Sequence, residues 1–349
     1  MINGNFFEDL TLGRRFDHGT PRTIGEAEAA LYIALTGARQ PLPSSRPLAL
    51  AIGLPDRPID DLLLFNMAFG KTVPDLSLNA IANLGYADVR FLAPVFAGDT
   101  IRARSQIIGR REAANGKAGV VYVRSEALDQ NGACVLSYVR WVLVRKAHPE
   151  RPDSVASLPE LPACVAPDHL APPPAGSARE AIMAATRSPT LWGNYAVGQR
   201  IDHPCGMTID PSDHTMATRL YQNCAKVHFD ALAMRDTPAG ERLVYGGHVI
   251  SLCRALSYDG LENVISIAAI NGGSHAAPTY AGDTIYCASE VIDRFALPSR
   301  SDVAALRLRL WGLKNLHPAG VELLTAEHGE ARRHPAVVLD LDYTVFVPV

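Results

Sequence analysis

A histidine, an asparagine and two glycines in the second half of the chain carry groups suited to proton-transfer chemistry. Asn223 and His228 lie in one segment, and Gly246 and Gly247 follow further along. A histidine with a pKa of about 6.5 can exchange a proton at neutral pH, and an amide can orient water without taking its proton. Backbone N–H groups at a glycine-containing helix N-terminus can stabilise a negatively charged oxygen. We therefore predict a site that moves a proton beside a developing oxyanion.

The chain contains the same sequence pattern twice. Five residues of the first half recur in the second half at an offset of 185, namely Gly13, Asp17, His18, Thr23 and Ile24. Residues 97–101 recur at an offset of 184. A repeat of this length indicates duplicated domains, because solenoid units are only about 20 to 50 residues long.

The polar pair Asn223 and His228 is found in only one of the two copies. At the corresponding positions the first copy has Ala38 and Pro43. We therefore predict that the second copy is catalytic and that the first copy is structural.

The composition predicts a globular protein that needs no metal. A chain of 349 residues with 48% hydrophobic residues can form about two domains with sizeable cores. A net charge of −3 gives no basic footprint for nucleic acid. The six cysteines are scattered without a CxxC pair, which argues against a zinc site or disulfides and suits the reducing cytoplasm. We find no signal peptide and no apolar run of about 18 residues, so we expect a cytoplasmic protein without a membrane partner.

Each half has its helical stretches first and its strands later. The expected helices include residues 62–72 and 249–258. The expected strands are residues 88–91, 100–108, 119–127 and 134–144 in the first half and 264–270, 284–292, 303–311 and 337–347 in the second. This order predicts an α+β fold in which an antiparallel sheet covers a helix. The chain lacks a Gly-rich strand-to-helix loop, which argues against a nucleotide-binding fold.

A proline-rich segment separates the two halves. Eight of the 25 prolines lie between residues 149 and 174, so we expect an extended connection rather than part of a core. The predicted organisation is a first domain at residues 1–148, a linker at 149–190 and a catalytic second domain at 191–349.

The site segment resembles the MaoC-type, R-specific enoyl-CoA hydratases, a family with the hot-dog fold. That family's motif is roughly Thr-Gly-Asp-x-Asn-Pro-Ile-His, and its last two positions match Val227 and His228. The stretch at residues 244–248 resembles the Val-His-Gly-Met-Leu sequence that opens the family's central helix, with Tyr245 in the position of the histidine. The resemblance covers almost the whole chain as a tandem, or double, hot-dog fold. The duplication, the linker and residues 222–228 are most similar to the mesaconyl-CoA hydratase branch of the family.

The resemblance implies reversible addition of water to a branched enoyl-CoA, with mesaconyl-CoA as the leading candidate. It implies no metal or other cofactor, because CoA is part of the substrate. His228 would transfer the protons, and Gly246 and Gly247 would form the oxyanion site. The family's usual aspartate is Asn223 here, which can position water but cannot take its proton. Either His228 acts with Asn223 as a positioning residue, or another carboxylate enters the site, from Asp210, Asp213 or Asp230.

The resemblance also implies that each half walls the site of the other, because the acyl-CoA tunnel of paired hot-dog domains follows their interface. The residues expected to bind substrate are Asp60, Asp61, Leu62, Leu63, Asn83, Leu84, Gly85, Tyr86, Pro94, Val95 and Phe96 from the first copy and Tyr245 and His248 from the second. A substrate with a second carboxylate would need a buried cation, because an unpaired buried carboxylate costs several kcal/mol. The candidates are Lys226 and Arg254, followed by Arg235 and Arg90.

Two other functions stay open at this point. A hot-dog acyl-CoA thioesterase would hydrolyse the thioester and release a free thiol. A non-catalytic acyl-CoA-binding protein is the other alternative, since the usual aspartate is missing. The sequence leaves the oligomeric state open, and a homo-oligomer is compatible with it.

Overall fold

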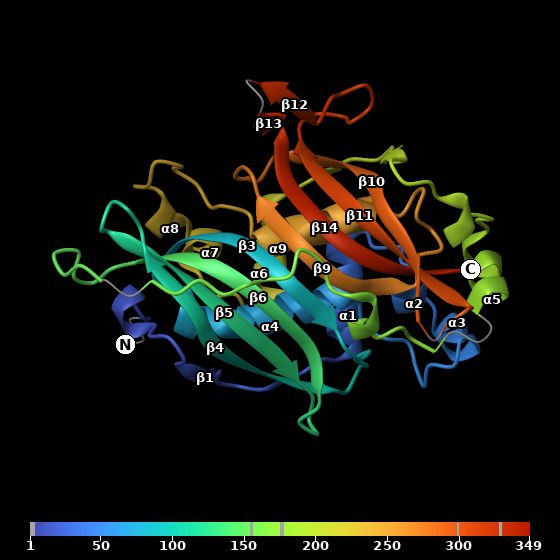
Figure 1. Cartoon of the computed structure of the whole chain (residues 1–349), viewed down its shortest axis with the longest axis horizontal. Helices are drawn as coiled ribbons and strands as arrows, with labels where there is room; N and C mark the ends of the chain where they lie inside the picture. The colour runs from blue at the N-terminus through green and yellow to red at the C-terminus, as the bar shows by residue number, and fades with distance from the viewer. Residues whose placement is uncertain (1–3, 154–155, 175–177, 299, 328–329) are drawn as a thin grey trace.

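The computed structural model describes residues 4–153, 156–174, 178–298, 300–327 and 330–349 (Figure 1). The elements before the linker are η1 (Phe7–Asp9), β1 (Arg15–Asp17), β2 (Arg22–Thr23), α1 (Glu26–Thr36), α2 (Pro41–Ser44), α3 (Arg46–Ala51), α4 (Asp61–Leu76), β3 (Ala80–Phe91), β4 (Thr100–Glu112), β5 (Ala118–Leu128) and β6 (Cys134–Arg145). The region between the copies contains η2 (Pro167–His169) and α5 (Ala178–Thr186). Its residues Val165, Leu170 and Ile182 are buried in a hydrophobic cluster, so this part of the connection does not stay outside the core as expected. The elements after it are η3 (Trp192–Asn194), β7 (Arg200–Asp202), β8 (Met207–Thr208), α6 (Pro211–Leu220), α7 (Lys226–Phe229), α8 (Ala231–Met234), α9 (Gly246–Leu256), β9 (Ser266–His275), β10 (Thr284–Ala296), β11 (Val303–Lys314), β12 (Leu324–Glu327), β13 (Glu330–Arg333) and β14 (Val337–Pro348).

The strands of both copies join one antiparallel sheet. Among the described residues its main path is β1-β4-β5-β6-β3-β9-β14-β11-β10-β7, so the two copies contribute the same order of strands with opposite direction along the path. The copies meet where β3 pairs with β9, in a register that aligns Tyr86 with Gly273 and Arg90 with Ala269. The predicted α+β double hot-dog fold is confirmed.

Each half of the sheet covers one long helix. Figure 1 shows α4 behind the strands of the first copy and α9 behind those of the second. Both helices are almost entirely buried, and they belong to one shared hydrophobic core. Of the helices that the structure describes, none combines the length and the apolar character needed to span a membrane.

Several elements extend beyond their predicted ends. Strand β3 begins at Ala80 rather than at residue 88, and α9 begins at Gly246 rather than at residue 249. The register of β3 against β6 shifts between Ala80 and Ala82 and again between Asn83 and Gly85. These irregularities break the alternation of apolar and polar residues while the backbone pairing continues, so the hydrophobic pattern conceals the first part of the strand.

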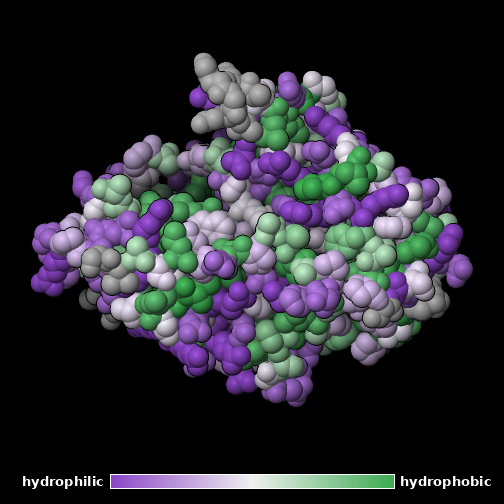
Figure 2. All heavy atoms as spheres, in the orientation of Figure 1, coloured by the Kyte–Doolittle hydropathy of each residue, from purple (hydrophilic) through white to green (hydrophobic). Residues whose placement is uncertain are grey.

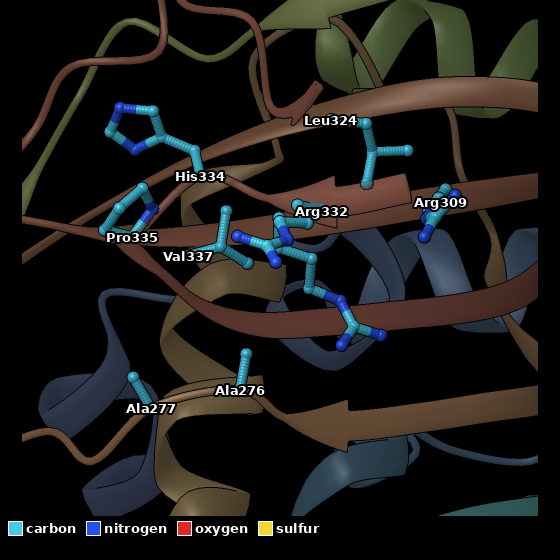
Figure 3. A pocket seen from close by; sticks show the side chains of 9 residues that line it. Ala276, Ala277, Arg309, Leu324, Arg332, His334, Pro335 and Val337 are labelled. Atoms are coloured by element: carbon cyan, nitrogen blue, oxygen red, sulfur yellow. The ribbon is translucent and has the colours of Figure 1, made fainter. Parts of the chain in front are cut away.

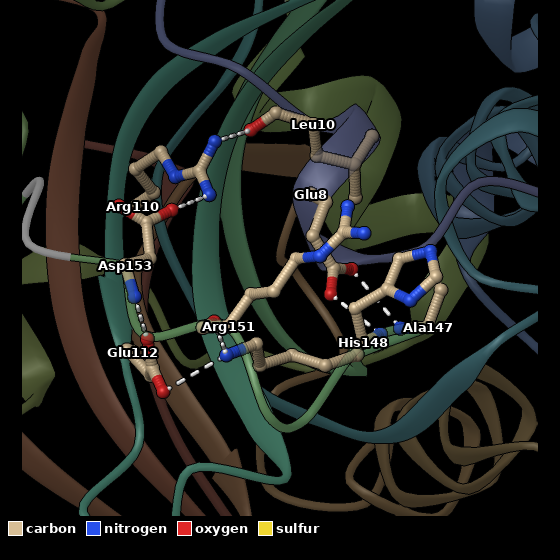
Figure 4. A network of polar contacts seen from close by, with 9 residues as sticks. Glu8, Leu10, Arg110, Glu112, Ala147, His148, Arg151 and Asp153 are labelled. Carbon is tan, nitrogen blue, oxygen red and sulfur yellow. Dashed lines mark hydrogen bonds and ion pairs between the residues drawn. The ribbon is translucent and has the colours of Figure 1, made fainter.

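A polar network fastens the start of the linker to the first copy (Figure 4). The buried Lys146 ammonium group contacts Glu112 at 3.0 Å, and the buried Arg110 guanidinium pairs with Asp153. Glu8 accepts hydrogen bonds from the N–H groups of residues 147 and 148. The chain therefore leaves the first copy along a defined path.

The outward face of the second copy carries ion pairs between neighbouring strands. Arg307 contacts Asp342 at 2.5 Å, and Arg309 contacts Asp340 at 2.9 Å, whereas the leucines between them in sequence are buried. Charged side chains on the outward face therefore alternate with buried leucines along this part of β11 and β14. Figure 2 shows hydrophilic and hydrophobic residues interspersed over this side of the molecule.

We expect Gly70→Ala to destabilise the protein, because α4 packs directly against the backbone that precedes the site segment. A Cβ atom at Gly70 would lie 1.8 Å from the carbonyl oxygen of Tyr221. Overpacking of this kind should lower the free energy of unfolding by about 1–3 kcal/mol, measured by urea denaturation. The control is Gly193→Ala, whose added Cβ meets nothing within 4 Å. Equal stability of the two variants would contradict the packing described here.

Candidate active site

Asn223 fixes the turn that leads into α7, the short helix that carries His228. Its side-chain Oδ1 accepts a hydrogen bond from the N–H group of Ala225 at 3.0 Å, and its own N–H group donates to the Thr218 carbonyl at 3.1 Å. The side chain is only 5% exposed. An asparagine side chain can close a turn in this way because its oxygen reaches the backbone two residues on. Asn223 and His228 are therefore held in one compact segment.

The His228 imidazole has a defined tautomer. Its Nδ1 lies 3.0 Å from the carbonyl oxygen of Leu243. A carbonyl oxygen can only accept, so Nδ1 carries the proton and Nε2 keeps a lone pair. Burial, together with the nearby His214, lowers the pKa of His228 to about 4, although the bond to Leu243 opposes the shift. The ring is therefore neutral at neutral pH, with Nε2 able to accept a proton.

Helix α9 begins with two backbone donors that lack acceptors. Its N-cap residue, Tyr245, makes no side-chain capping bond, and within the described residues the N–H groups of Gly246 and Gly247 have no hydrogen-bond partner. A Cβ at Gly246 would lie 2.5 Å from Nε2 of His275, and one at Gly247 would lie 2.0 Å from Oδ1 of Asn66. Glycine at both positions therefore lets β9 and α4 approach the helix N-terminus closely.

His275, which the sequence analysis missed, also lies at this site. It ends β9, and its Nε2 lies 3.4 Å from the hydroxyl of Tyr86 in the first copy. Burial lowers the pKa of His275 to about 4, and the nearby His228 contributes to the shift. Two histidines of the second copy and a tyrosine of the first therefore meet around the start of α9.

The repeat contains the signal that could have revealed His275. Four histidines near the site are His214, His228, His248 and His275. Offsets of 185 for the first two and 184 for the others give their first-copy counterparts as Ala29, Pro43, Leu64 and Phe91. Each of these four histidines corresponds to an apolar residue of the first copy. Comparing every histidine of the second copy with its counterpart would therefore have identified all four.

Tyr245 links His228 to the interior of the molecule. Its ring contacts the His228 ring with centroids 5.5 Å apart and the Tyr221 ring at 5.8 Å. The Tyr221 hydroxyl lies 3.4 Å from Nδ1 of His248, and burial lowers the pKa of His248 to about 3. His248 therefore lies one layer of side chains behind His228.

The carboxylates considered as replacements for the usual aspartate lie at helix ends. Asp210 is the N-cap residue of α6, and Asp230 caps α8 by accepting the N–H group of Ala233 at 3.0 Å. Asp213 accepts a hydrogen bond from the neighbouring Ser212. No carboxylate among the described residues pairs with His228. Within the same residues, its imidazole has one hydrogen-bond partner, the backbone carbonyl of Leu243.

Asp60, Asp61 and Arg254 come together elsewhere, at the first copy's counterpart of the His228 site. They line a cavity of about 10 Å³ with Pro43, the counterpart of His228. Asp61 accepts the N–H group of Ile267 at 2.8 Å, and burial and the charge of Asp60 raise the pKa of Asp61 to about 7. A cavity this small holds no more than about one water molecule, so the first copy's site is closed.

The other predicted substrate-binding residues of the first copy are divided between core and surface. Leu62, Leu63 and Val95 are buried in the core, and Gly85 packs against the Trp141 ring. Asn83 and Phe96 are half-buried, whereas Leu84 and Pro94 are exposed. Tyr86, by contrast, contacts His275 directly. Of the candidate cations, Lys226 and Arg235 are exposed, and Arg90 pairs with Asp88 at 2.6 Å.

An open, arginine-rich pocket of about 520 Å³ lies beside the residues that follow His275 (Figure 3). Ala276 and Ala277 form one wall, and the basic residues of the opposite wall are Arg309, Arg332, Arg333 and His334. Arg309 and Arg333 both pair with Asp340, at 2.9 and 2.7 Å. In the part of the chain that the structure describes, no group of three or more His, Cys, Asp or Glu residues is arranged to hold a metal ion.

Comparison with known proteins places this arrangement in a family. The family model described as mesaconyl-CoA hydratase matches residues 2–312. The chain is 50% identical over 345 residues to the β-methylmalyl-CoA dehydratase of Chloroflexus aurantiacus, covering 99% of this chain and 97% of that protein. It is also 50% identical over 345 residues to the mesaconyl-CoA hydratase of Cereibacter sphaeroides, covering 99% and 98% of the two chains.

Solved structures agree with the fold. A MaoC domain protein dehydratase from Chloroflexus aurantiacus superposes with a TM-score of 0.96 at 49% identity, covering 100% of this chain and 98% of that one. A Mycobacterium tuberculosis protein with a double hotdog fold gives a TM-score of 0.73 at 23% identity, covering 99% of both chains. With two histidines, two free glycine amides and a full-length match in sequence and structure, the chain belongs to the mesaconyl-CoA hydratase family of MaoC-like double hot-dog proteins.

Proposed function

We propose that this chain catalyses the reversible addition of water to mesaconyl-CoA, which gives β-methylmalyl-CoA. The observation that carries the proposal is the neutral His228, whose protonated Nδ1 is bound to Leu243 and whose Nε2 is left as a base. The identity of 50% over nearly the full length, both to a protein named a hydratase and to one named a dehydratase, supports the same substrate pair in both directions.

The reaction needs one proton to leave water and one to reach the α-carbon of the thioester. Nε2 of His228 takes a proton from water while the water oxygen bonds to the β-carbon. The electron pair of the C=C bond then moves towards the thioester oxygen, where the N–H groups of Gly246 and Gly247 donate hydrogen bonds. The proton held on Nε2 passes to the α-carbon as the thioester C=O re-forms. Asn223 serves as a positioning residue because it fixes the turn before α7.

We assign the CoA moiety to the arginine-rich pocket beside Ala276 and Ala277. Arginine side chains in its lining suit the phosphates of CoA, and its wall continues directly from His275 in the chain. A CoA bound there would bring its thioester end towards the start of α9.

We expect His228→Ala to lower kcat for hydration of mesaconyl-CoA by about 10²–10⁴-fold, because it removes the general base. The measurement is loss of the absorbance of the conjugated enoyl thioester, with a thiol reagent in a parallel assay. The control is His148→Ala, at a side chain that is 51% exposed. Release of free thiol by the wild-type protein would favour a thioesterase. Unchanged hydration in His228→Ala would contradict the proposed role of this residue.

The activity should stay constant from neutral pH down to about 5 and fall at lower pH. Because burial depresses the pKa of His228 to about 4, the base becomes protonated only when the pH falls through that value. The acid limb of kcat/KM reports ionisation of the free enzyme, so its midpoint should lie near pH 4. An acid limb centred at about 6.5, the ordinary value for histidine, would show that the active ring is solvated rather than buried.

A further inference from the structure

Arg140, on the inner face of β6, is a buried cation without a carboxylate partner. Its side chain is 0% exposed. Nη2 donates to Oγ1 of Thr72 at 2.9 Å and to Oγ of Ser77 at 2.8 Å, whereas Nε and Nη1 have no hydrogen-bond partner among the described residues. Burial lowers the pKa of Arg140. Two buried donors of a permanently charged group therefore lack an acceptor, which is unusual in a folded protein.

The Arg140 guanidinium packs against a group of aromatic side chains that extends to His228. The guanidinium lies 4.1 Å from the centroid of the Phe69 ring. Phe69 contacts Tyr245 with ring centroids 5.6 Å apart, and Tyr245 contacts His228 at 5.5 Å. Two aromatic rings therefore connect the cation to the base.

A second connection runs along the sheet. Arg140 is directly opposite Tyr86 in the pairing of β6 with β3, so the two side chains lie on the same face. The Tyr86 hydroxyl is the one that contacts Nε2 of His275. Arg140 thus lies behind the first-copy wall of the second copy's site.

The second copy has no cation at the corresponding place. An offset of 184 converts Tyr86 into Ile270, and Ile270 is paired with Tyr343 in the same way as Tyr86 is paired with Arg140. The arginine is therefore specific to the half of the molecule that walls the His228 site, and the common fold does not require it.

The closed site of the first copy contains another buried arginine, Arg254, with which Arg140 can be compared. There Arg254 lies beside Asp60 and Asp61. Burial raises the pKa of both carboxyl groups, and the charge of Arg254 opposes this shift. Arg254 at the closed site has carboxylates of the protein nearby, whereas Arg140 pairs with no carboxylate among the described residues.

We propose that Nε and Nη1 of Arg140 form the subsite for the free carboxylate at the end of the acyl group. This inference rests on the proposed function, because it assumes a substrate with a second carboxylate. A guanidinium edge matches a carboxylate with two parallel hydrogen bonds, and a buried carboxylate requires such a partner. We therefore assign the carboxylate-binding cation to Arg140 instead of Lys226 or Arg254. Lys226 is exposed, and Arg254 lies at the closed site.

The subsite predicts that a variant of Arg140 changes the enzyme's preference between two acyl-CoAs that differ in a single group. Tigloyl-CoA has a methyl group where mesaconyl-CoA has its free carboxylate. We expect Arg140→Met to lower kcat/KM for mesaconyl-CoA by about 100-fold, because a charge-assisted hydrogen-bonded contact is lost. Turnover of tigloyl-CoA should change by less than about threefold in the same variant, since a methyl group does not use these donors.

The control is Arg110→Met, which removes another buried arginine of the first copy, one that already pairs with Asp153. It should reduce the turnover of both acyl-CoAs equally or leave both unchanged. Equal loss for both substrates in Arg140→Met, as in the control, would overturn the subsite and make Arg140 a structural residue.

Binding separates failure of the subsite from failure of the proposed reaction. Calorimetric titration of mesaconyl-CoA and tigloyl-CoA into His228→Ala and into His228→Ala with Arg140→Met requires no turnover. The second substitution should weaken binding of mesaconyl-CoA about 100-fold and leave tigloyl-CoA unaffected, even if the wild-type protein hydrates neither compound. If both ligands bind equally well with and without Arg140, the subsite is wrong whatever reaction the protein catalyses.

Discussion

Strands β3 and β9 pair at the centre of the sheet, and the rest of the site depends on this pairing. It joins the two copies into one continuous surface, so a residue at the end of β9 lies beside residues of β3. The contact between Tyr86 and His275 is the direct consequence. Neither copy alone would bring a first-copy hydroxyl to a second-copy imidazole, so the duplicated chain contains one site that draws on both halves.

The same pairing brings the two central helices into one core, and their contact limits which residues fit at the N-terminus of α9. Asn66 of α4 donates hydrogen bonds to the Gly247 carbonyl and to Ser251. With α4 this close, a side chain at Gly247 has no space, because its Cβ would lie 2.0 Å from Oδ1 of Asn66. Close packing of α4 against α9 and the oxyanion site therefore both require glycine at the start of α9.

Loss of chemistry in the first copy follows from a small number of replacements. Pro43 stands where the second copy has His228, and Asp61 stands where it has Tyr245. Asp61 turns to the backbone of β9 and, with Asp60 and Arg254, leaves almost no cavity. The first copy then contributes by its inner face, where Tyr86 and Arg140 stand in place of Ile270 and Tyr343 of the second copy.

The fold and the first members of the site could be predicted from sequence because duplication provides an internal comparison. Asn223 and His228 differ from Ala38 and Pro43 within an ungapped segment, which identified them. His275 was missed because the expected strand ends at residue 270, whereas β9 continues to His275, the counterpart of Phe91. Arg140 could not be recognised in this way, because a charged residue in a strand usually faces water, and only the register against Tyr86 and the absence of a carboxylate reveal its burial. The assignment of Arg254 failed for a related reason: the sequence does not tell which of two pseudo-equivalent cavities a residue of the central helix faces.

The central claim is that His228 is a neutral imidazole with its proton on Nδ1 and a free lone pair on Nε2. Nitrogen-15 NMR of protein labelled at histidine tests this claim directly, with the His228→Ala spectrum used to assign the signal. At pH 7 we expect a protonated, pyrrole-type shift for Nδ1 and an unprotonated, pyridine-type shift for Nε2. A signal from the opposite tautomer, or from a doubly protonated ring at that pH, would contradict the account.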